Sequence, residues 1–185
     1  MAEKVVISVL GRDRPGIVAA VSQILLEKGC NIEDVSQTML QTEFAGIFIA
    51  TLPGSCAPSE LLEKLREGLG HLDLEVVMKA LIDDPKTSSP QSGEPFVVTT
   101  MGSDRLGLVA GITDVMARFR VNITNLKAIF RGGNDPHGNT MIYEVSIPES
   151  ADFRAFRREL LARSKALGLE LNLQHRDIFE AIHRV

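Results

Sequence analysis

The sequence contains few aromatic side chains and few cysteines. Its 185 residues include no Trp, one Tyr and two Cys, and aromatic residues make up 5% of the chain. RNA-recognition domains stack bases on exposed aromatic side chains beside basic residues, so this composition argues against an RNA ligand. Cys30 and Cys56 form no CxxC motif and suggest neither a disulfide framework nor a thiolate metal site. We expect two reduced thiols.

Excess basic charge and long hydrophobic runs are also missing. The formal net charge is −4, whereas proteins that bind the polyanionic nucleic-acid backbone usually carry a basic patch. The sequence has no charged start followed by an apolar segment, as in a signal peptide, and no apolar run that spans a bilayer. We therefore expect a cytoplasmic protein that binds neither nucleic acid nor membrane directly.

The composition that remains is that of a globular protein. Hydrophobic residues make up 44% and charged residues 24% of the chain, which is the balance of a protein that buries a core. A polar stretch rich in Ser and Pro over residues 84–94 has the character of a linker. We therefore expect two domains, at residues 1–83 and 95–176, followed by a C-terminal tail at residues 177–185.

Residues 11–16, Gly-Arg-Asp-Arg-Pro-Gly, separate two segments of different periodicity. The β-branched residues 4–10 before them are typical of a buried strand, and apolar residues recur at helical spacing from Ile17 onward. We expect a strand-to-helix turn, with Pro15 at the first helical position and Asp13 capping the exposed amides.

This turn is a candidate anion site. Free amides and the positive end of a helix dipole attract a carboxylate or a phosphate. Gly11 and Gly16 would let a small ligand approach the main chain closely. The alternative is a capped connection that binds nothing, as most strand-to-helix turns are.

The hexapeptide occurs twice. Residues 102–107, Gly-Ser-Asp-Arg-Leu-Gly, follow a second apolar strand at a constant offset of 91 residues. The register continues without a gap as far as the strand after the helix, which indicates an internal duplication. Identical pairs from the hexapeptide onward are Gly11/Gly102, Asp13/Asp104, Arg14/Arg105, Gly16/Gly107, Val18/Val109, Ala19/Ala110, Asn31/Asn122 and Ile32/Ile123.

Periodicity predicts the order β-α-β-β-α-β in each half. Right-handed crossovers then place both helices on one face of a four-stranded antiparallel sheet, giving an α+β chain of two ferredoxin-like units. Strand residues such as Ile47, Ile49, Val77 and Leu81 make the other face apolar as well. Because small domains rarely leave such a face bare, we expect the units to pair or the chain to form a homo-oligomer.

Two segments fall outside this repeat. Residues 132–139, between the middle strands of the second half, consist of turn-forming residues and suggest a solvated hairpin loop. His137 with Asp135 in this loop is too few ligands to predict a metal site, and we expect no metal and no cofactor. Apolar residues over 178–182 suggest a short helix that docks on a sheet or on the neighbouring unit.

Taken together, these residues resemble the ACT domain family of small regulatory modules. The resemblance rests on three consecutive features: a strand, then Gly-Arg-Asp-Arg-Pro-Gly-Ile-Val at residues 11–18, then a helix that ends just before Asn31-Ile32. The second half of the chain repeats this pattern. It implies a βαββαβ fold, paired units, and a small effector, often an amino acid, bound at the interface near the turn. The tandem arrangement without a catalytic domain is similar to glycine cleavage system transcriptional repressors, which implies a non-catalytic regulator of amino-acid metabolism.

The resemblance also implies which residues bind the effector. The turn would offer backbone amides to the carboxylate of an amino acid, and Asn31 of the partnering unit would accept from its amino group. The second turn has Leu106 where the first has Pro15, and Ser103 where it has Arg12, so it is less rigid and is a candidate structural half-site. The implied residues are Asp13, Arg14, Pro15, Gly16, Ile17, Asn31 and Ile32, with Asp104, Arg105, Gly107, Leu108, Asn122 and Ile123 in the repeat.

Two alternatives to a sensor stay open. Arg14 with Asn31 loosely resembles the site of acylphosphatase-like enzymes, although the chain lacks their longer amide-rich loop and offers no Ser/Cys–His pair or carboxylate dyad. A ligand-free interaction module is the other alternative. Since the sequence contains no helix-turn-helix pattern, control of transcription would act through a DNA-binding protein partner.

Overall fold

The computed structural model describes residues 3–81, 93–130 and 138–183 and divides into two compact units, Met1–Pro85 and Lys86–Val185. The predicted linker at residues 84–94 lies outside the described residues except for Gly93 and Glu94, which belong to a strand. The proposed loop residues Asp135 and His137 also lie outside the described residues.

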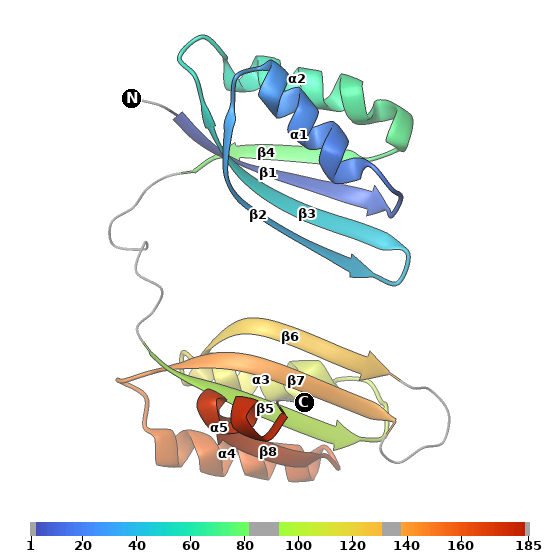
Figure 1. Ribbon diagram of the computed structural model, residues 1–185. Helices are drawn as coiled ribbons and strands as arrows, with labels where there is room; N and C mark the ends of the chain where they lie inside the picture. The colour runs from blue at the N-terminus through green and yellow to red at the C-terminus, as the bar shows by residue number, and fades with distance from the viewer. Residues whose placement is uncertain (1–2, 82–92, 131–137, 184–185) are drawn as a thin grey trace. The chain divides into compact units, whose positions relative to one another are not determined.

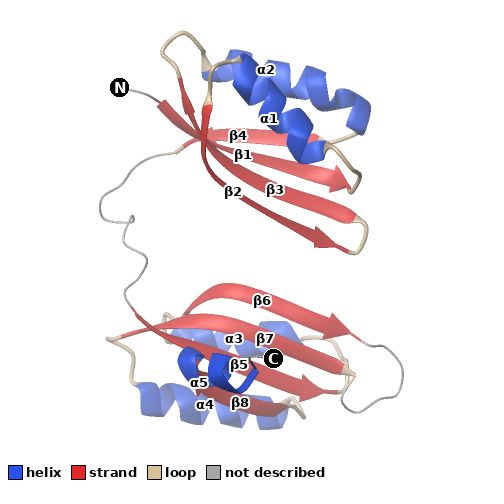
Figure 2. Cartoon of the chain, viewed as in Figure 1, coloured by secondary structure: helices blue, strands red, loops and turns tan. Residues whose placement is uncertain are grey.

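The first unit has the predicted βαββαβ order. Its antiparallel sheet has the strand order β2-β3-β1-β4, and both long helices cover one face of it (Figures 1 and 2). A 3-10 turn, η1, separates α2 from the last strand, which begins at Glu75. The elements are β1 (Glu3–Arg12), α1 (Ile17–Glu27), β2 (Asn31–Leu40), β3 (Glu43–Leu52), α2 (Pro58–Leu69), η1 (Gly70–Leu72) and β4 (Glu75–Ala80).

The second unit repeats this topology and adds a C-terminal helix, α5. Its sheet has the order β6-β7-β5-β8, which matches the first sheet strand for strand and confirms two ferredoxin-like α+β units. None of the helices in the described residues has the length and hydrophobicity to cross a membrane. The elements are β5 (Gly93–Gly102), α3 (Leu108–Arg118), β6 (Asn122–Phe130), β7 (Asn139–Pro148), α4 (Phe153–Ala166), β8 (Glu170–His175) and α5 (Arg176–His183).

Each unit has its own hydrophobic core between its sheet and its two long helices. Alternate residues of the central strands point into it, as strand geometry requires. Phe48 in the first core pairs in register with Ile7, and Tyr143 in the second pairs with Val98, so these rings occupy equivalent places. Leu65 of α2 corresponds to Leu160 of α4 by the 95-residue offset between Phe48 and Tyr143, and both are fully buried, as is Phe156.

Gly11 lies within β1, where the absence of a side chain serves packing. β1 continues through Gly11 and Arg12, and a Cβ on Gly11 would lie 2.8 Å from Leu74 Cδ2 and 2.9 Å from the Asp73 carbonyl oxygen. A Cβ on Gly102 would lie 2.7 Å from Leu169 Cδ2. The repeated glycine therefore lets the first strand of each unit pass close to the segment before its last strand.

The C-terminal helix α5 forms as predicted and docks on its own unit. It lies against β5 and β8 on the sheet face that α3 and α4 leave open (Figure 1). Val97 on this face is 3% exposed, whereas Val6, its counterpart in the first unit, is only partly buried. Arg176 at the start of α5 forms an ion pair with Glu144, which also accepts a hydrogen bond of 2.9 Å from Asn125 Nδ2. α5 thus covers part of the second sheet.

Candidate functional site

The first turn does not begin its helix as the sequence suggested. Pro15 lies in the turn before the helix, and α1 begins at Ile17 with Gly16 as its N-cap residue. Gly16 has φ 98°, a left-handed conformation that a side chain disfavours. Asp13 does not cap the helix. Its N–H donates instead to the Thr42 carbonyl oxygen at 2.7 Å, which ties the turn to the β2–β3 hairpin.

No side chain in the described residues caps the start of α1. The first intrahelical hydrogen bond runs from Ala20 N–H to the Gly16 carbonyl oxygen at 2.9 Å. The preceding amides of the first turn have no intrahelical partner, as at the start of any helix. α4 differs, because the Asp152 side chain accepts from Ala155 N–H at 3.0 Å. The start of α1 therefore presents free donors and the positive end of its dipole.

These donors border a hollow of about 350 Å³. It brings together all five residues of the first turn that the sequence singled out, and it adds Gln37 from β2 and Phe44 from β3. The lining residues are Asp13, Arg14, Pro15, Gly16, Ile17, Val18, Ala19, Gln37 and Phe44.

A β-bulge explains why the sequence did not reveal Gln37. The pairing of β2 with β3 shifts between Ile32 and Asp34, so that Gln37 stands opposite Gly46 on the helix-covered face. Without the extra residue, strict alternation from Ile32 would place Gln37 on the other face. Phe44 was only weakly indicated by the sequence, as a large apolar residue directly after the hairpin turn.

The hollow offers both signs of charge to a small ligand. The guanidinium of Arg14 and the free amides of α1 can donate to a carboxylate, and the carboxylate of Asp13 can accept from an ammonium group. The side-chain amide of Gln37 adds one acceptor oxygen and two donors. This combination complements a zwitterion better than it does a lone phosphate.

Asn31 and Ile32 do not reach this hollow. Asn31 stands opposite Thr51, which itself stands opposite Lys4 near the start of β1, whereas the turn follows Arg12 at its end. Eight residues of strand separate the two places by about 26 Å at 3.3 Å per residue. A single unit therefore does not bring Asn31 and the turn together.

The second turn keeps the backbone conformation of the first but differs around it. Gly107 has φ 86° and precedes α3, which begins at Leu108. Asp104 Oδ1 accepts from Asn139 Nδ2 at 3.4 Å, and a Cβ on Gly168 would lie 3.4 Å from Arg105 Nη2. Asp104 and Arg105 thus face neighbours in their own unit.

Asn122 and Ile123 again lie apart from their turn. Asn122 stands opposite Ser146, which stands opposite Pro95, seven residues or about 23 Å along β5 from Gly102. Both line a different hollow of about 500 Å³ beside α3. Its residues are Ala110, Thr113, Asp114, Met116, Ala117, Val121, Asn122 and Ile123.

The described residues offer no metal site or reactive thiol. No group of three or more His, Cys, Asp and Glu side chains within them is placed to hold a metal ion. Cys30 and Cys56 are free and buried, as expected for reduced thiols. Burial, and then the neighbouring Cys56, raise the pKa of the Cys30 thiol to about 11, so it is protonated at neutral pH.

The chain is similar to three kinds of known protein. The glycine cleavage system transcriptional repressor of Escherichia coli is 32% identical over 172 residues, covering 91% of this chain and 86% of that protein. A UPF0237 protein of Methanosarcina acetivorans is 41% identical over 91 residues, covering 49% of this chain and 95% of that protein. The crystal structure of an unknown protein from Galdieria sulphuraria shares the fold, with a TM-score of 0.77, 21% identity, and coverage of 95% and 99%.

The family model described as the ACT domain matches the sequence twice, over residues 3–79 and 94–174. Each match covers one of the two units, from its first strand to its last. The chain therefore belongs to the ACT domain family and carries two ACT units in tandem.

Proposed function

We propose that this chain is a non-catalytic regulatory protein that senses a small amino acid through its ACT units and modulates a protein partner. The observation that carries the proposal is the hollow at the first turn, where uncapped helix amides lie beside Arg14, Asp13 and Gln37. Similarity over most of the chain to the E. coli repressor supports a regulatory role in amino-acid (glycine) metabolism.

The effector is held by its two charged groups. Its carboxylate accepts from the first amides of α1 and from Arg14, and its ammonium group lies toward Asp13 and Gln37. Asn31 of another unit or copy closes the site and accepts from the same ammonium group. The second turn acts as a structural half-site, because Asp104 and Arg105 already face their own unit.

The chain acts as a homo-oligomer in this proposal. Since Asn31 lies about 26 Å from the turn in its own unit, association is needed to complete the site. The open face of the first sheet also presents Ile47 at 51% and Val77 at 63% exposure, an apolar surface that a second copy would cover.

Regulation follows from the shared site. An effector that binds the associated form more tightly than the separate one shifts the balance between them, typically with a coupling of about 1–3 kcal/mol. The partner recognises one of these forms. For control of transcription the partner is a DNA-binding regulator, which agrees with the net negative charge of this chain.

A thermal-shift screen against the twenty amino acids, several nucleotides and acyl phosphates tests the proposal. A ligand at about 100 times its Kd stabilises the fold by about 2.7 kcal/mol, which raises Tm by several degrees. We expect the shift to be lost in Arg14→Ala and Asn31→Ala and kept in Asn122→Ala, the matched change in the second unit. Gly16→Val is a poor test, because its φ of 98° makes any side chain strain the fold.

Two results would overturn the sensor. The absence of any shift with an amino acid would favour a ligand-free interaction module. Turnover of an acyl phosphate, lost in Arg14→Ala, would favour the acylphosphatase-like alternative.

A further inference from the structure

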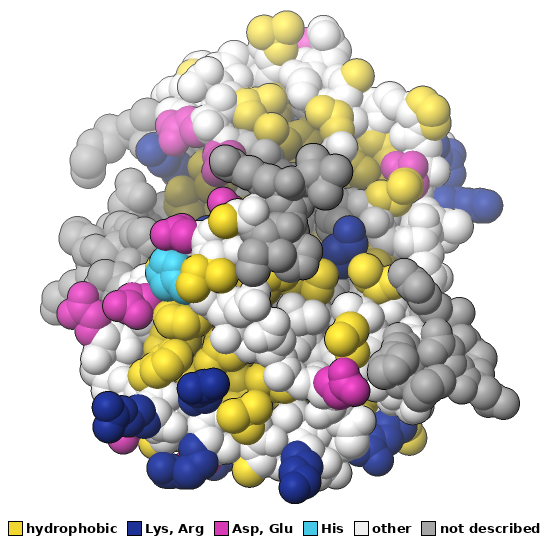
Figure 3. All heavy atoms as spheres, turned by 60° about the horizontal axis from the view of Figure 1, so that its bottom comes forward, with side chains coloured by type: hydrophobic (Ala, Val, Ile, Leu, Met, Phe, Trp, Pro, Cys, Tyr) yellow, Lys and Arg dark blue, Asp and Glu magenta, His cyan; other side chains and the backbone are white. Residues whose placement is uncertain are grey.

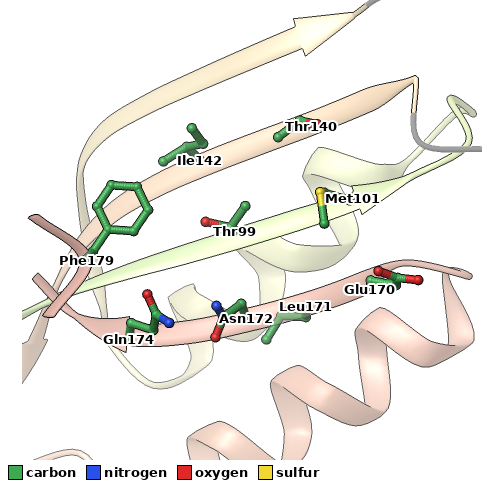
Figure 4. A pocket seen from close by; sticks show the side chains of 9 residues that line it. All are labelled: Thr99, Met101, Thr140, Ile142, Glu170, Leu171, Asn172, Gln174 and Phe179. Carbon is green, nitrogen blue, oxygen red and sulfur yellow. The ribbon is translucent and has the colours of Figure 1, made fainter. Parts of the chain in front are cut away.

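The open face of the second sheet contains a hollow of about 430 Å³ beside α5, far in sequence from the effector turn. Figure 4 shows side chains from β5, β7 and β8 around it, with Phe179 of α5 at one end and Glu170 at the other. Its volume is in the range of small-molecule sites. The lining residues are Thr99, Met101, Thr140, Ile142, Glu170, Leu171, Asn172, Gln174 and Phe179.

The strand register builds the floor of this hollow from two rows of side chains. In one row Thr99 lies between Ile142 and Asn172. In the next row Met101 lies between Thr140 and Glu170, two residues along each strand. Since side chains alternate along a strand, both rows point away from the core and toward the hollow.

The polar groups of the lining accept hydrogen bonds and carry no positive charge. Glu170 is the single charged residue among those that line the hollow, and the others are hydroxyls, amides and apolar side chains. Lys127 stands opposite Ile142 on β6 but does not line the hollow, and Arg176 is paired with Glu144. A carboxylate or phosphate ligand would therefore meet a negative charge without a compensating cation.

One acceptor in the lining is buried without a partner. The Gln174 Oε1 atom is shielded from solvent and has no hydrogen-bond partner among the described residues. Leaving a buried acceptor unpaired is unfavourable, so a ligand that brings an N–H or O–H donor to this atom binds more tightly than one that does not. Figure 4 places the Gln174 side chain near Phe179 and Thr99, at the covered end of the hollow.

Glu170 has an equivalent in the first sheet, Glu75 opposite Leu10, but the two amides of the lining have none. In the first sheet, Val77 has the register position of Asn172, since it stands opposite Ser8 as Asn172 stands opposite Thr99. By the same comparison, Lys79 stands opposite Val6 where Gln174 stands opposite Val97. The same fold therefore forms without these amides, which are specific to the second sheet.

We propose that this hollow binds an organic amine that carries an apolar group and no carboxylate. The apolar group lies against Phe179 and Ile142, a donor of the ligand pairs with Gln174 Oε1, and the ammonium group lies at Glu170. Gln174 and Glu170 are four residues apart on β8, or about 13 Å, which sets the length of the ligand. The site is separate from the amino-acid site proposed above and excludes amino acids by their carboxylate.

Three compounds with one skeleton test the proposal, each with a phenol O–H as the donor for Gln174 Oε1: 4-(4-hydroxyphenyl)butylamine, 4-(4-hydroxyphenyl)butanol and 4-(4-hydroxyphenyl)butyrate. Isothermal titration into the full chain is expected to detect binding of the amine, at least tenfold weaker binding of the alcohol, and none of the acid. Glu170→Gln should reduce the affinity for the amine at least tenfold and leave that for the alcohol unchanged. Glu149→Gln removes a charge from an exposed residue outside the lining and is the matched control.

Thr99→Leu fills the floor of the hollow and should abolish binding of both the amine and the alcohol. Because Glu170 is exposed, Glu170→Gln keeps the fold even where Thr99→Leu disturbs it. Equal binding of the acid and the amine, equal effects of Glu170→Gln and Glu149→Gln, or no binding at all would each overturn the proposal. Amine binding that persists in Arg14→Ala, where the amino-acid shift is lost, would separate this site from the effector site.

Discussion

The two sheets share one topology, but their open faces differ. The first exposes Ile47 and Val77, whereas the second has Asn172 in the place of Val77 and is partly covered by α5. The helix-covered faces have kept the same apolar character, because each must build a core. Duplication thus preserved the face that stabilises each unit and left the other face free to change.

The two strand-to-helix turns differ in the same way. Both end in a glycine with positive φ, which the backbone requires. In the first, Asp13 and Arg14 line a hollow together with Gln37, and in the second Asp104 and Arg105 face neighbours within the unit. Identical residues at equivalent positions therefore do not make equivalent sites.

Charge separates the units as well. Residues 1–85 contain thirteen Asp and Glu against seven Lys and Arg, whereas residues 86–185 contain eleven against thirteen. Figure 3 shows Lys and Arg side chains set among hydrophobic ones on the face of the second unit that it presents. The net charge of the whole chain conceals this asymmetry.

The largest expected effect tests whether the two cores are independent. Leu65→Ala in the first unit should cost about 2–5 kcal/mol, and Phe156→Ala in the second about 3–5 kcal/mol, through lost burial and the cavity left behind. Hydrogen exchange should accelerate in β1 and β3 for Leu65→Ala and in β5 and β7 for Phe156→Ala. Faster hydrogen exchange in both units after either substitution would contradict separate cores.

The next test uses Tyr143, which occupies in the second core the place that Phe48 has in the first. Burial raises the pKa of Tyr143 to about 12 from 10. Because the folded state disfavours the phenolate, its contribution to stability is complete below pH 10 and is lost as the pH rises toward 12. As the chain has one Tyr, absorbance at 295 nm should titrate near pH 12 in the folded protein. A midpoint near pH 10 before unfolding would contradict this burial, and Tyr143→Phe should remove the step.

A smaller effect tests the bare face of the first sheet. Val77→Asn introduces the residue found at the equivalent place in the second sheet and should change the stability of the separate chain by at most about 0.5 kcal/mol, since the side chain is exposed. If a second copy covers this face, analytical ultracentrifugation should show that Val77→Asn raises the Kd of the dimer at least tenfold, which corresponds to about 1.4 kcal/mol of association free energy. Unchanged association in Val77→Asn and Ile47→Asn would place the interface elsewhere.

The smallest effect concerns the attachment of α5. The hydrogen bond from Asn125 and then the pairing with Arg176 lower the pKa of Glu144 below its usual 4.5. Their contribution is therefore present above pH 4.5 and is lost as the pH falls below it. For this partly exposed pair we expect at most about 1 kcal/mol. Acid unfolding of Glu144→Gln should lack this part of the pH dependence, and Glu149→Gln should behave as wild type.

Much of the fold could be predicted because local patterns and burial agree. Strand alternation, helical spacing and the repeat at offset 91 indicated two βαββαβ units, and the structure confirms them. Helix caps were predicted less well. Asp13 and Pro15 have the residue types of a helix start, yet the chain reaches α1 through Gly16 because the turn is tied to Thr42 across the hairpin.

The sequence by itself determined the duplication, the ACT fold and the turn that carries the candidate effector site, because all three depend on residue types at short spacing. Only the tertiary structure decided which side chains meet there. The bulge in β2 turns Gln37 toward the hollow, the length of β1 separates Asn31 from the turn, and the docking of α5 forms a hollow on the second sheet. Each depends on contacts between segments distant in the chain, which no local pattern records.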